Sequence, residues 1–276
     1  NHVADFIKYK YKVEDLYLTS LNHEFITNLE HYLRTVRKCN HNSSVKYIKN
    51  FKKIIRLAIK NDWLSKDPFF NYKVSVKPVK REFLDAEEIT KLENKKFHIP
   101  RLEQVRDIFI FSCYTGLAYK DVLDLTPDNI RTGIDGEKWI FTDRAKTSVK
   151  SHVPLLPKAL QIIEKYNDWH ENVIKGKLLP VISNQKMNAY LKEIAVLAEI
   201  KKNLTYHLAR HTFATTITLT NDVPIETVSE MLGHKSIKTT QIYAKVIDKK
   251  VSGDMVRLKE KLQAEPKTSG KRKVTK

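Results

Sequence analysis

The densest group of side chains that could do chemistry lies between residues 207 and 211. His207, Arg210 and His211 are three and four positions apart, so a helix would place them on one face. A guanidinium offers a phosphate two parallel donors, and a histidine can give or take a proton near neutral pH. The spacing indicates phosphate chemistry, and a surface or capping cluster is the plainer alternative.

A second group lies between residues 232 and 243. Gly233 is expected to end a helix over residues 224–232, and His234 follows it directly. Tyr243 comes nine positions after His234, on the next expected helix. A tyrosine there could be a nucleophile, but taken alone it is more often a packed aromatic side chain.

Metal and nucleotide chemistry have little support in the sequence. His207 and His211 have the i, i+4 spacing of a metal pair, but the glutamate of an HExxH motif is absent and no third ligand is evident. Neither a GxGxxG run nor a GxxxxGKS/T loop is present to hold a nucleotide phosphate. We therefore expect no metal and no cofactor.

The composition points to a polyanionic partner. The 276 residues include 50 Lys and Arg against 32 Asp and Glu, which gives a formal net charge of +18. Nucleic acid is the commonest partner of such a chain. Two cysteines exclude a disulfide framework and a four-cysteine zinc site. No apolar run reaches the roughly 18 residues of a membrane span, so we expect no membrane partner.

The elements expected before residue 72 form a small helical domain. Apolar periodicity predicts a helix over residues 22–36 and a second one that starts after the N-cap residues Ser43 and Ser44 and runs to about 60. The polar side of the second helix carries basic residues that could contact DNA phosphates: Lys49, Lys52, Lys53, Arg56 and Lys60. A solvated lysine face is the alternative.

The rest of the chain is expected to be mostly helical, with strands only between residues 128 and 156. The expected helices begin near 85 and then cover 102–114, 158–167, 185–198, 206–219, 224–232, 236–244 and 249–263. The expected fold is mainly α with a small antiparallel β-sheet (α+β). The expected domains are 1–76, a linker at 77–83, a catalytic domain at 84–264 and a disordered basic tail at 265–276.

The order and spacing of these motifs resemble one known family. His207-x-x-Arg210, then Leu232-Gly-His234, then Tyr243 resemble the C-terminal signature of the tyrosine recombinases, the phage integrase family. Asp121-Val-Leu-Asp-Leu resembles the family's first motif. Arg144-Ala-Lys146-Thr resembles its hairpin lysine. The resemblance covers about residues 15–262, so the basic N-terminal segment would be the family's core-type DNA-binding domain. The segment from Phe111 to Tyr119 is most like integrases of Bacteroides-type conjugative or mobile elements.

The resemblance implies a role for each matching residue. Tyr243 would attack the scissile phosphate and form a 3′-phosphotyrosyl bond, without metal or ATP. Arg210 would stabilise the transition state, and His207 and His234 would donate hydrogen bonds or move protons. Lys146 would protonate the leaving 5′-oxygen as general acid.

One position departs from the family's pattern. The first motif normally carries arginine after Thr-Gly-Leu, and this chain has Ala118 there. We consider Arg106, on the preceding expected helix, as a substitute cation, and an ion pair with Glu103 or Asp107 as its alternative role. Asp121 matches the family's acidic position, where a carboxylate orients the cations.

The resemblance also implies partners for the chain, and two alternative functions stay open. The expected partners are double-stranded DNA at core or crossover sites, further copies in a homotetramer on DNA, and a DNA-bending host factor. The expected location is the bacterial cytoplasm, at the nucleoid. A further N-terminal arm-binding domain would precede the chain. Two alternatives stay open: a catalytically impaired DNA-binding relative with an accessory or regulatory role, and a type IB topoisomerase-like enzyme.

Overall fold

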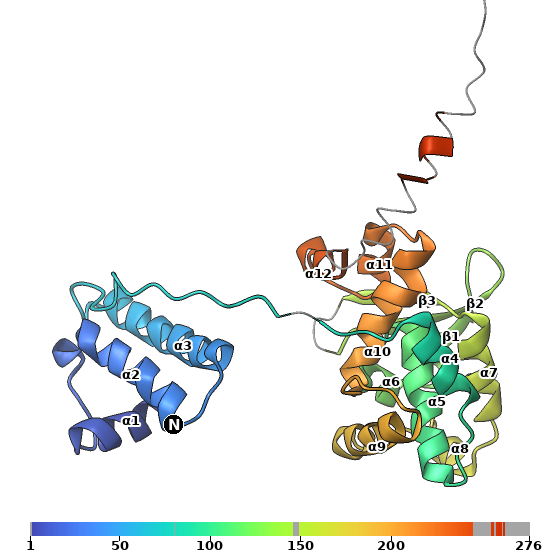
Figure 1. Cartoon of the computed structure of the whole chain (residues 1–276), viewed down its shortest axis with the longest axis horizontal. Coiled ribbons are helices and arrows are strands. Elements are labelled where there is room, and N and C mark those ends of the chain that lie inside the picture. Colours follow the sequence, from blue (N-terminus) through green and yellow to red (C-terminus); the bar gives the residue numbers. More distant parts are fainter. Residues whose placement is uncertain are drawn as a thin grey trace, which may run out of the picture. The chain divides into compact units, whose positions relative to one another are not determined.

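The computed structural model describes residues 2–79, 81–145, 149–244, 255–256, 258–260 and 262. The chain divides into two compact units, Asn1–Lys80 and Arg81–Lys276, which we describe separately (Figure 1). Within the described ranges, no helix combines the length and the apolar character that crossing a membrane requires.

The first unit is a small helical bundle of α1 (His2–Tyr11), α2 (His23–Thr35) and α3 (His41–Lys60). Asparagine side chains cap the two longer helices: Asn22 accepts the Phe25 N–H, and Asn40 accepts the Ser43 N–H. The cap at Asn40 starts α3 before the expected Ser43. Helix α1 was not expected, because its buried side is only Phe6 and Ile7.

Helix α5 (Pro100–Thr115) is the centre of the second unit. Most of its side chains are buried, and its apolar residues are not confined to one face, as is typical of a buried helix. It packs against α4 (Ala86–Asn94), α7 (Pro157–Lys165), α9 (Asn184–Leu197) and α10 (Tyr206–Thr212). Gly116 ends α5 with a left-handed φ of 70°, which the glycine adopts without strain.

The expected sheet is present and has three strands: β1 (Ile130–Thr132), β2 (Lys138–Asp143) and β3 (Lys150–Pro154). They are antiparallel in the order β1-β2-β3. Ile140 and Val153 pair across β2 and β3, and both are fully buried. The alternation of buried and exposed side chains along β3 therefore fixes which face of the sheet meets the core.

The remaining helices are short: α6 (Tyr119–Asp124), α8 (His170–Lys175), α11 (Ile225–Met231) and α12 (Gln241–Ala244). The expected helix over 206–219 is not regular, because α10 continues as a π-helical turn at Phe213–Thr218. The Thr218 hydroxyl donates to the carbonyl oxygens of Phe213 and Ala214 there. The expected fold class is confirmed. Most of the expected helix over 249–263 and the whole tail 265–276 lie outside the described residues.

Candidate active site

Arg210 is held between the ends of two helices. It lies on α10 and is 3% exposed. Its Nη1 donates to the Gly116 carbonyl oxygen at 2.7 Å, where α5 ends. Its Nη2 donates to the Leu232 carbonyl oxygen, where α11 ends. The last carbonyl groups of a helix lack intrahelical donors and carry partial negative charge, so both ends suit a guanidinium.

Arg144 shares the second of these acceptors. It follows β2 and is 8% exposed, and its Nη1 donates to the Leu232 carbonyl oxygen at 2.6 Å. Because Arg144 and Arg210 donate to one oxygen, their guanidinium groups are adjacent. The sequence places them 66 positions apart, and we assigned no role to Arg144 from the sequence.

Asp121 orients Arg144. Its Oδ2 lies 3.0 Å from Arg144 Nε, and its Oδ1 accepts the Ala145 N–H at 3.0 Å. These contacts join the start of α6 to the end of β2. Asp121 and Arg144 line a cleft of about 420 Å3 together with Ala118 and His207. The acidic position of the sequence motif therefore faces a cation, and that cation is Arg144.

Tyr243 is buried against a histidine. It lies on α12 and is 4% exposed, and its hydroxyl is 3.0 Å from Nδ1 of His211. The His207 and His211 rings meet edge to face with centroids 4.6 Å apart. The helical spacing thus predicts that these two histidines lie together, but it does not show that His211 reaches Tyr243.

His234 is positioned by the end of α11. The Gly233 N–H donates to the Glu230 carbonyl oxygen at 2.8 Å, and the His234 N–H donates to the Ser229 carbonyl oxygen at 3.1 Å. Gly233 has a φ of 59°, as expected for a glycine that ends a helix. His234 Nδ1 lies 2.8 Å from Thr240 Oγ1, so the turn that leads to α12 holds the ring.

Burial and positive charge set the protonation states of the site. Burial and the charges of His207, Arg81 and Arg210 lower the pKa of His211 to about 4. Burial and adjacent arginine charges also lower the pKa of His234 to about 4. Both rings are therefore neutral at pH 7.

The pKa values of Tyr243 and Arg210 also depend on burial and on the neighbouring charges. Burial raises the pKa of Tyr243, while the charges of Arg210, Arg81 and Arg144 act in the opposite direction. Burial and the neighbouring Arg144 lower the pKa of Arg210 to about 9, so this guanidinium keeps its charge at neutral pH. In the DNA-free protein, Tyr243 is therefore a neutral phenol beside a neutral imidazole.

The low pKa of His211 should make the protein less stable in mild acid. Between pH 6.5 and about 4 the unfolded chain takes up a proton at His211 that the folded chain does not. The stability that the low pKa of His211 gives the folded protein is complete above pH 6.5 and is lost as the pH falls. For this one residue we expect a loss of about 2 kcal/mol between pH 7.5 and pH 5.

Urea unfolding at these two pH values tests this expectation. His211→Gln should lose less stability than the wild type on acidification, and His98→Gln, at an exposed histidine, should behave as the wild type. An equal acid loss in His211→Gln and the wild type would show that His211 titrates normally in the folded protein.

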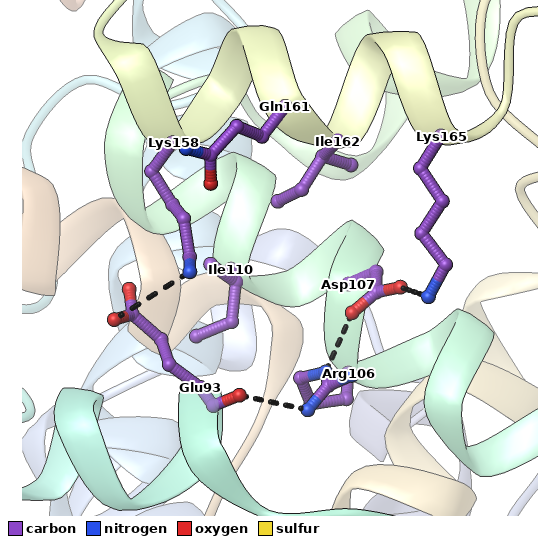
Figure 2. Close-up of a pocket in the computed structure, with 8 residues that line it drawn as sticks. All are labelled: Glu93, Arg106, Asp107, Ile110, Lys158, Gln161, Ile162 and Lys165. Carbon is purple, nitrogen blue, oxygen red and sulfur yellow. Dashed lines mark hydrogen bonds and ion pairs between the residues drawn. The ribbon is translucent and has the colours of Figure 1, made fainter.

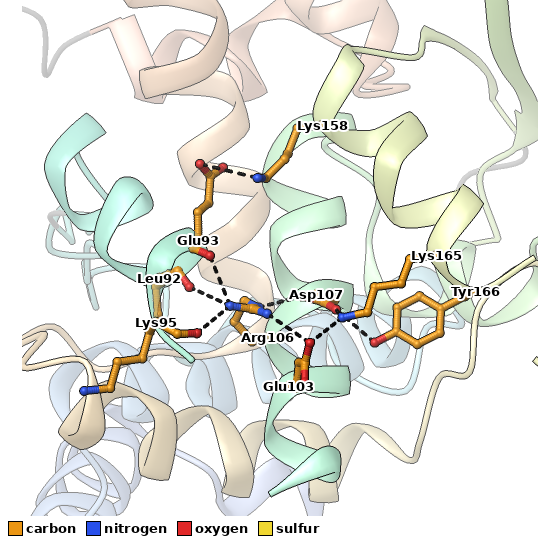
Figure 3. A network of polar contacts seen from close by, with 9 residues as sticks. All are labelled: Leu92, Glu93, Lys95, Glu103, Arg106, Asp107, Lys158, Lys165 and Tyr166. Carbon is orange, nitrogen blue, oxygen red and sulfur yellow. Dashed lines mark hydrogen bonds and ion pairs between the residues drawn. The ribbon is translucent and has the colours of Figure 1, made fainter. Parts of the chain in front are cut away.

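Arg106 does not lie with the other candidates. Its Nη1 donates to the carbonyl oxygens of Leu92, Glu93 and Lys95 at 3.1, 3.2 and 2.7 Å, around the end of α4 (Figure 3). Its Nε lies 2.5 Å from Asp107 Oδ1. Its Nη2 lies 3.7 Å from Glu103 Oε1, so these contacts agree with the alternative role of an ion pair with Glu103 or Asp107.

The surroundings of Arg106 form a network of mixed charge that joins α4, α5 and α7. Lys165 Nζ lies 2.7 Å from Asp107 Oδ2, and the Tyr166 hydroxyl donates to the same oxygen at 2.9 Å. Lys158 pairs with Glu93 at 3.8 Å. The network surrounds a cavity of about 150 Å3 (Figure 2). Its charges are paired internally, so we assign it to the stability of the helix packing.

The remaining candidates are Lys146 and the basic residues of the first unit. Lys146 lies outside the described residues. In the first unit, Lys52 Nζ donates to the carbonyl oxygens of Phe69 and Tyr72 at 2.7 and 3.3 Å, so it holds the chain that follows α3. The other basic residues of that face are exposed: Lys49, Lys53, Arg56 and Lys60.

No group of three or more His, Cys, Asp or Glu in the described part of the chain could hold a metal ion. Arg210, Arg144, His207, His211 and Tyr243 instead form a cationic site with one buried phenol. Such a site can bind a phosphate and can place a tyrosine hydroxyl against it.

Comparison with known proteins assigns the chain to a family. Residues 82–250 match the phage integrase family, and residues 1–74 match the phage integrase SAM-like domain. The chain belongs to the phage integrase family, the tyrosine site-specific recombinases, which are DNA strand-exchange enzymes. The small helical unit is thus the family's SAM-like domain, and the second unit is its catalytic domain.

Individual relatives differ in their sequence identity to this chain and in how much of it they match. The tyrosine recombinase XerD of Staphylococcus haemolyticus is 26% identical over 220 residues, which cover 74% of this chain and 72% of that protein. A tyrosine recombinase of Agathobacter rectalis is 38% identical over 97 residues, which cover 32% of this chain and 30% of that protein.

Solved structures share the fold. A lambda integrase (75-356) dimer bound to a COC′ core site has a TM-score of 0.67 at 17% identity, and the match covers 87% of this chain and 86% of that one. XerH bound to a palindromic difH substrate, in a post-cleavage complex, has a TM-score of 0.64 at 17% identity, with 87% and 71% covered. The Tn1549 transposon integrase in complex with a circular intermediate DNA has a TM-score of 0.65 at 15% identity, with 88% and 93% covered.

Proposed function

We propose that this chain cleaves and rejoins DNA strands at core sites through a covalent bond between Tyr243 and a 3′-phosphate. The observation that carries the proposal is the Tyr243 hydroxyl, buried 3.0 Å from Nδ1 of His211. Two adjacent guanidinium groups, Arg210 and Arg144, act on the same hydroxyl electrostatically. A structural tyrosine needs neither of these surroundings.

The reaction is an exchange of phosphodiesters. The Tyr243 oxygen forms a bond to phosphorus, and the bond from phosphorus to the 5′-oxygen breaks. The phenol proton passes to Nδ1 of His211, which is neutral at pH 7 and therefore free to accept it. The leaving 5′-oxygen takes a proton from Lys146. Attack by the 5′-hydroxyl of a partner strand reverses these steps.

Arg210 neutralises the phosphate as negative charge grows on it in the transition state. Its guanidinium is fixed by the carbonyl oxygens of Gly116 and Leu232, so it needs no reorganisation when the phosphate arrives. His207 and His234 supply further hydrogen bonds to the phosphate oxygens. A neutral histidine still carries one N–H donor, so its low pKa is compatible with this role.

The two units have different roles, DNA binding and catalysis. In our proposal residues 1–76 bind the DNA backbone through Lys49, Lys53, Arg56 and Lys60, residues 77–83 link the units, and residues 84–264 perform catalysis. Exposure of those four side chains supports the first part. Lys52 adds little to DNA binding, because its Nζ is already bonded to the chain.

The biological setting is a bacterial mobile element. We propose a Bacteroides-type element, a cytoplasmic, nucleoid-associated location, a homotetramer on two DNA sites and assistance from a DNA-bending host factor. The motif from Phe111 to Tyr119 supports the element type. The structural similarity to a lambda integrase tetramer bound to a Holliday junction, with a TM-score of 0.66, supports the assembly.

Covalent trapping tests the function. The wild-type protein is incubated with a nicked duplex that carries the element's crossover site, without metal or ATP, and run on a denaturing gel. We expect a protein–DNA adduct that is lost completely in Tyr243→Phe. Tyr190→Phe, at a half-buried tyrosine of α9, is the matched control and should form the adduct.

The other outcomes separate the rivals. Tight, salt-sensitive binding of the correct site without an adduct would favour a catalytically impaired DNA-binding relative. An adduct that also forms on unrelated duplexes, with relaxation of supercoiled plasmid, would favour a topoisomerase-like enzyme.

A further inference from the structure

We propose that Arg144 supplies the second phosphate-binding guanidinium of the active site, the one that Ala118 cannot supply. The proposal rests on the strand-exchange function above and adds a catalytic residue to it. Arg144 comes from the end of β2, whereas Ala118 lies at the start of α6. Five observations on Arg144 support this assignment.

The first observation is that Arg144 is buried next to Arg210. Both side chains donate to the carbonyl oxygen of Leu232, Arg144 through Nη1 at 2.6 Å and Arg210 through Nη2. A surface arginine would turn into water, but Arg144 is 8% exposed. The end of α11 therefore holds two cations side by side.

The second observation is an excess of buried positive charge. Asp121 balances one of the two guanidinium groups, through its contact with Arg144 Nε. Among the described residues, Arg210 is bonded to two carbonyl oxygens and to no carboxylate. Buried charges are costly unless they are paired, so this arrangement is expected where an anion binds during function.

The third observation is that Arg144 keeps donors for a ligand. Nη1 is engaged by Leu232 and Nε faces Asp121, and within the described ranges no hydrogen bond occupies Nη2. Nη2 can therefore donate to a non-bridging phosphate oxygen. The hydrogen bond at Nη1 and the ion pair at Nε hold the guanidinium in place before the DNA binds.

The fourth observation is the cleft itself. Ala118, Asp121, Arg144 and His207 line one space of about 420 Å3. A long side chain at position 118 would enter the space that Arg144 approaches from the sheet. The small side chain of Ala118 and the buried Arg144 therefore fit together as one arrangement.

The fifth observation is the close fit of Gly233 against the stem of Arg144. A Cβ at Gly233 would lie 2.6 Å from Cγ and 3.2 Å from Cδ of Arg144. Real side chains do not pack so closely, so the absence of a side chain at Gly233 gives Arg144 its path to Leu232. The turn that positions His234 thus also positions Arg144.

The test uses four variants of the full chain in the covalent trapping assay. Arg144→Ala should lower the rate of adduct formation about 10²–10³-fold while DNA binding persists. Arg144→Lys should recover only part of the rate, because lysine lacks the planar pair of donors. The double variant Ala118→Arg with Arg144→Ala should regain activity, because arginine from position 118 can enter the same cleft. Arg131→Ala, at an exposed arginine of β1, is the control.

A second substrate separates an electrostatic role from a structural one. A duplex with a methylphosphonate at the scissile position lacks the negative charge that Arg144 is proposed to neutralise. The rate ratio of wild type to Arg144→Ala should fall from about 10²–10³ on phosphate toward about one on methylphosphonate. A variant that is merely misfolded would be slow on both substrates.

The experiment distinguishes failure of the Arg144 assignment from failure of the proposed strand-exchange function. Near-normal cleavage by Arg144→Ala, with an adduct from the wild type, would overturn the assignment and leave strand exchange intact. An unchanged rate ratio on the neutral substrate, together with no recovery from Ala118→Arg, would also overturn it. If wild type forms no adduct at all, the proposed function itself fails.

Discussion

Replacing Arg210 by lysine should lower the rate of covalent adduct formation about 10²–10³-fold, although the charge is kept. The loss is expected because the guanidinium is fixed by two separate acceptors, the carbonyl oxygens of Gly116 and Leu232. A lysine ammonium is a mobile point charge that cannot bridge both helix ends and still face a phosphate. The rate is measured by single-turnover trapping on the nicked duplex.

Arg210→Ala should be at least as slow and also less stable. The buried Gly116 carbonyl then loses its donor, while the Leu232 carbonyl keeps the hydrogen bond from Arg144. An unsatisfied buried group costs about 1–3 kcal/mol. Arg101→Lys is the matched control, because Arg101 is an exposed arginine of α5. Wild-type rates in Arg210→Lys would mean that charge alone matters and that the two carbonyl contacts only support the fold.

Local sequence patterns account for most of the fold. The apolar stripes of α2 and α3 and the glycine that ends α5 are readable because each depends on residues within a few positions. The cap of α3 is Asn40, not the expected Ser43 or Ser44. The π-helical turn after α10 was missed, because it depends on the Thr218 hydroxyl competing for backbone carbonyl groups. Helix α8 was missed as well, because its six residues give too short a pattern.

The candidate site was predictable where one helix holds its residues together. Spacing alone puts His207 and His211 on one face of α10, and their rings are in contact. The contact between His211 and Tyr243 depends on how the turn through Gly233 returns the chain to α10. No local sequence pattern specifies this path of the chain, so the contact between His211 and Tyr243 is not predictable from the sequence.

The environments of Arg106 and Arg144 also depend on contacts between residues far apart in the sequence. Arg106 was considered because it is near Ala118 in the sequence, but on α5 it points to the open carbonyl groups at the end of α4. Arg144 was not considered, since 26 positions separate it from Ala118. Asp121 and Arg144 meet where the chain that follows β2 contacts the start of α6, a long-range contact that periodicity does not report.

Replacing Gly233 by alanine should reduce adduct formation nearly as much as Arg144→Ala, although neither the old nor the new side chain touches DNA. The new Cβ would lie 2.6 Å from Arg144 Cγ, so Arg144 must leave its place beside Leu232. The positive φ of 59° adds a backbone cost of about 1–2 kcal/mol in an L-residue. Trapping rates and urea unfolding are measured together.

Gly176→Ala is the control that separates these two effects. Gly176 also has a φ of 59°, and a Cβ there would meet nothing within 4 Å. Both alanine variants share the backbone cost, so Gly233→Ala should lose at least as much stability as Gly176→Ala, while only Gly233→Ala should lose activity. Equal activity in the two variants would show that the stem of Arg144 can shift without cost to the reaction. A loss confined to Gly233→Ala would instead tie the rate to the position of Arg144, because backbone strain is common to both proteins.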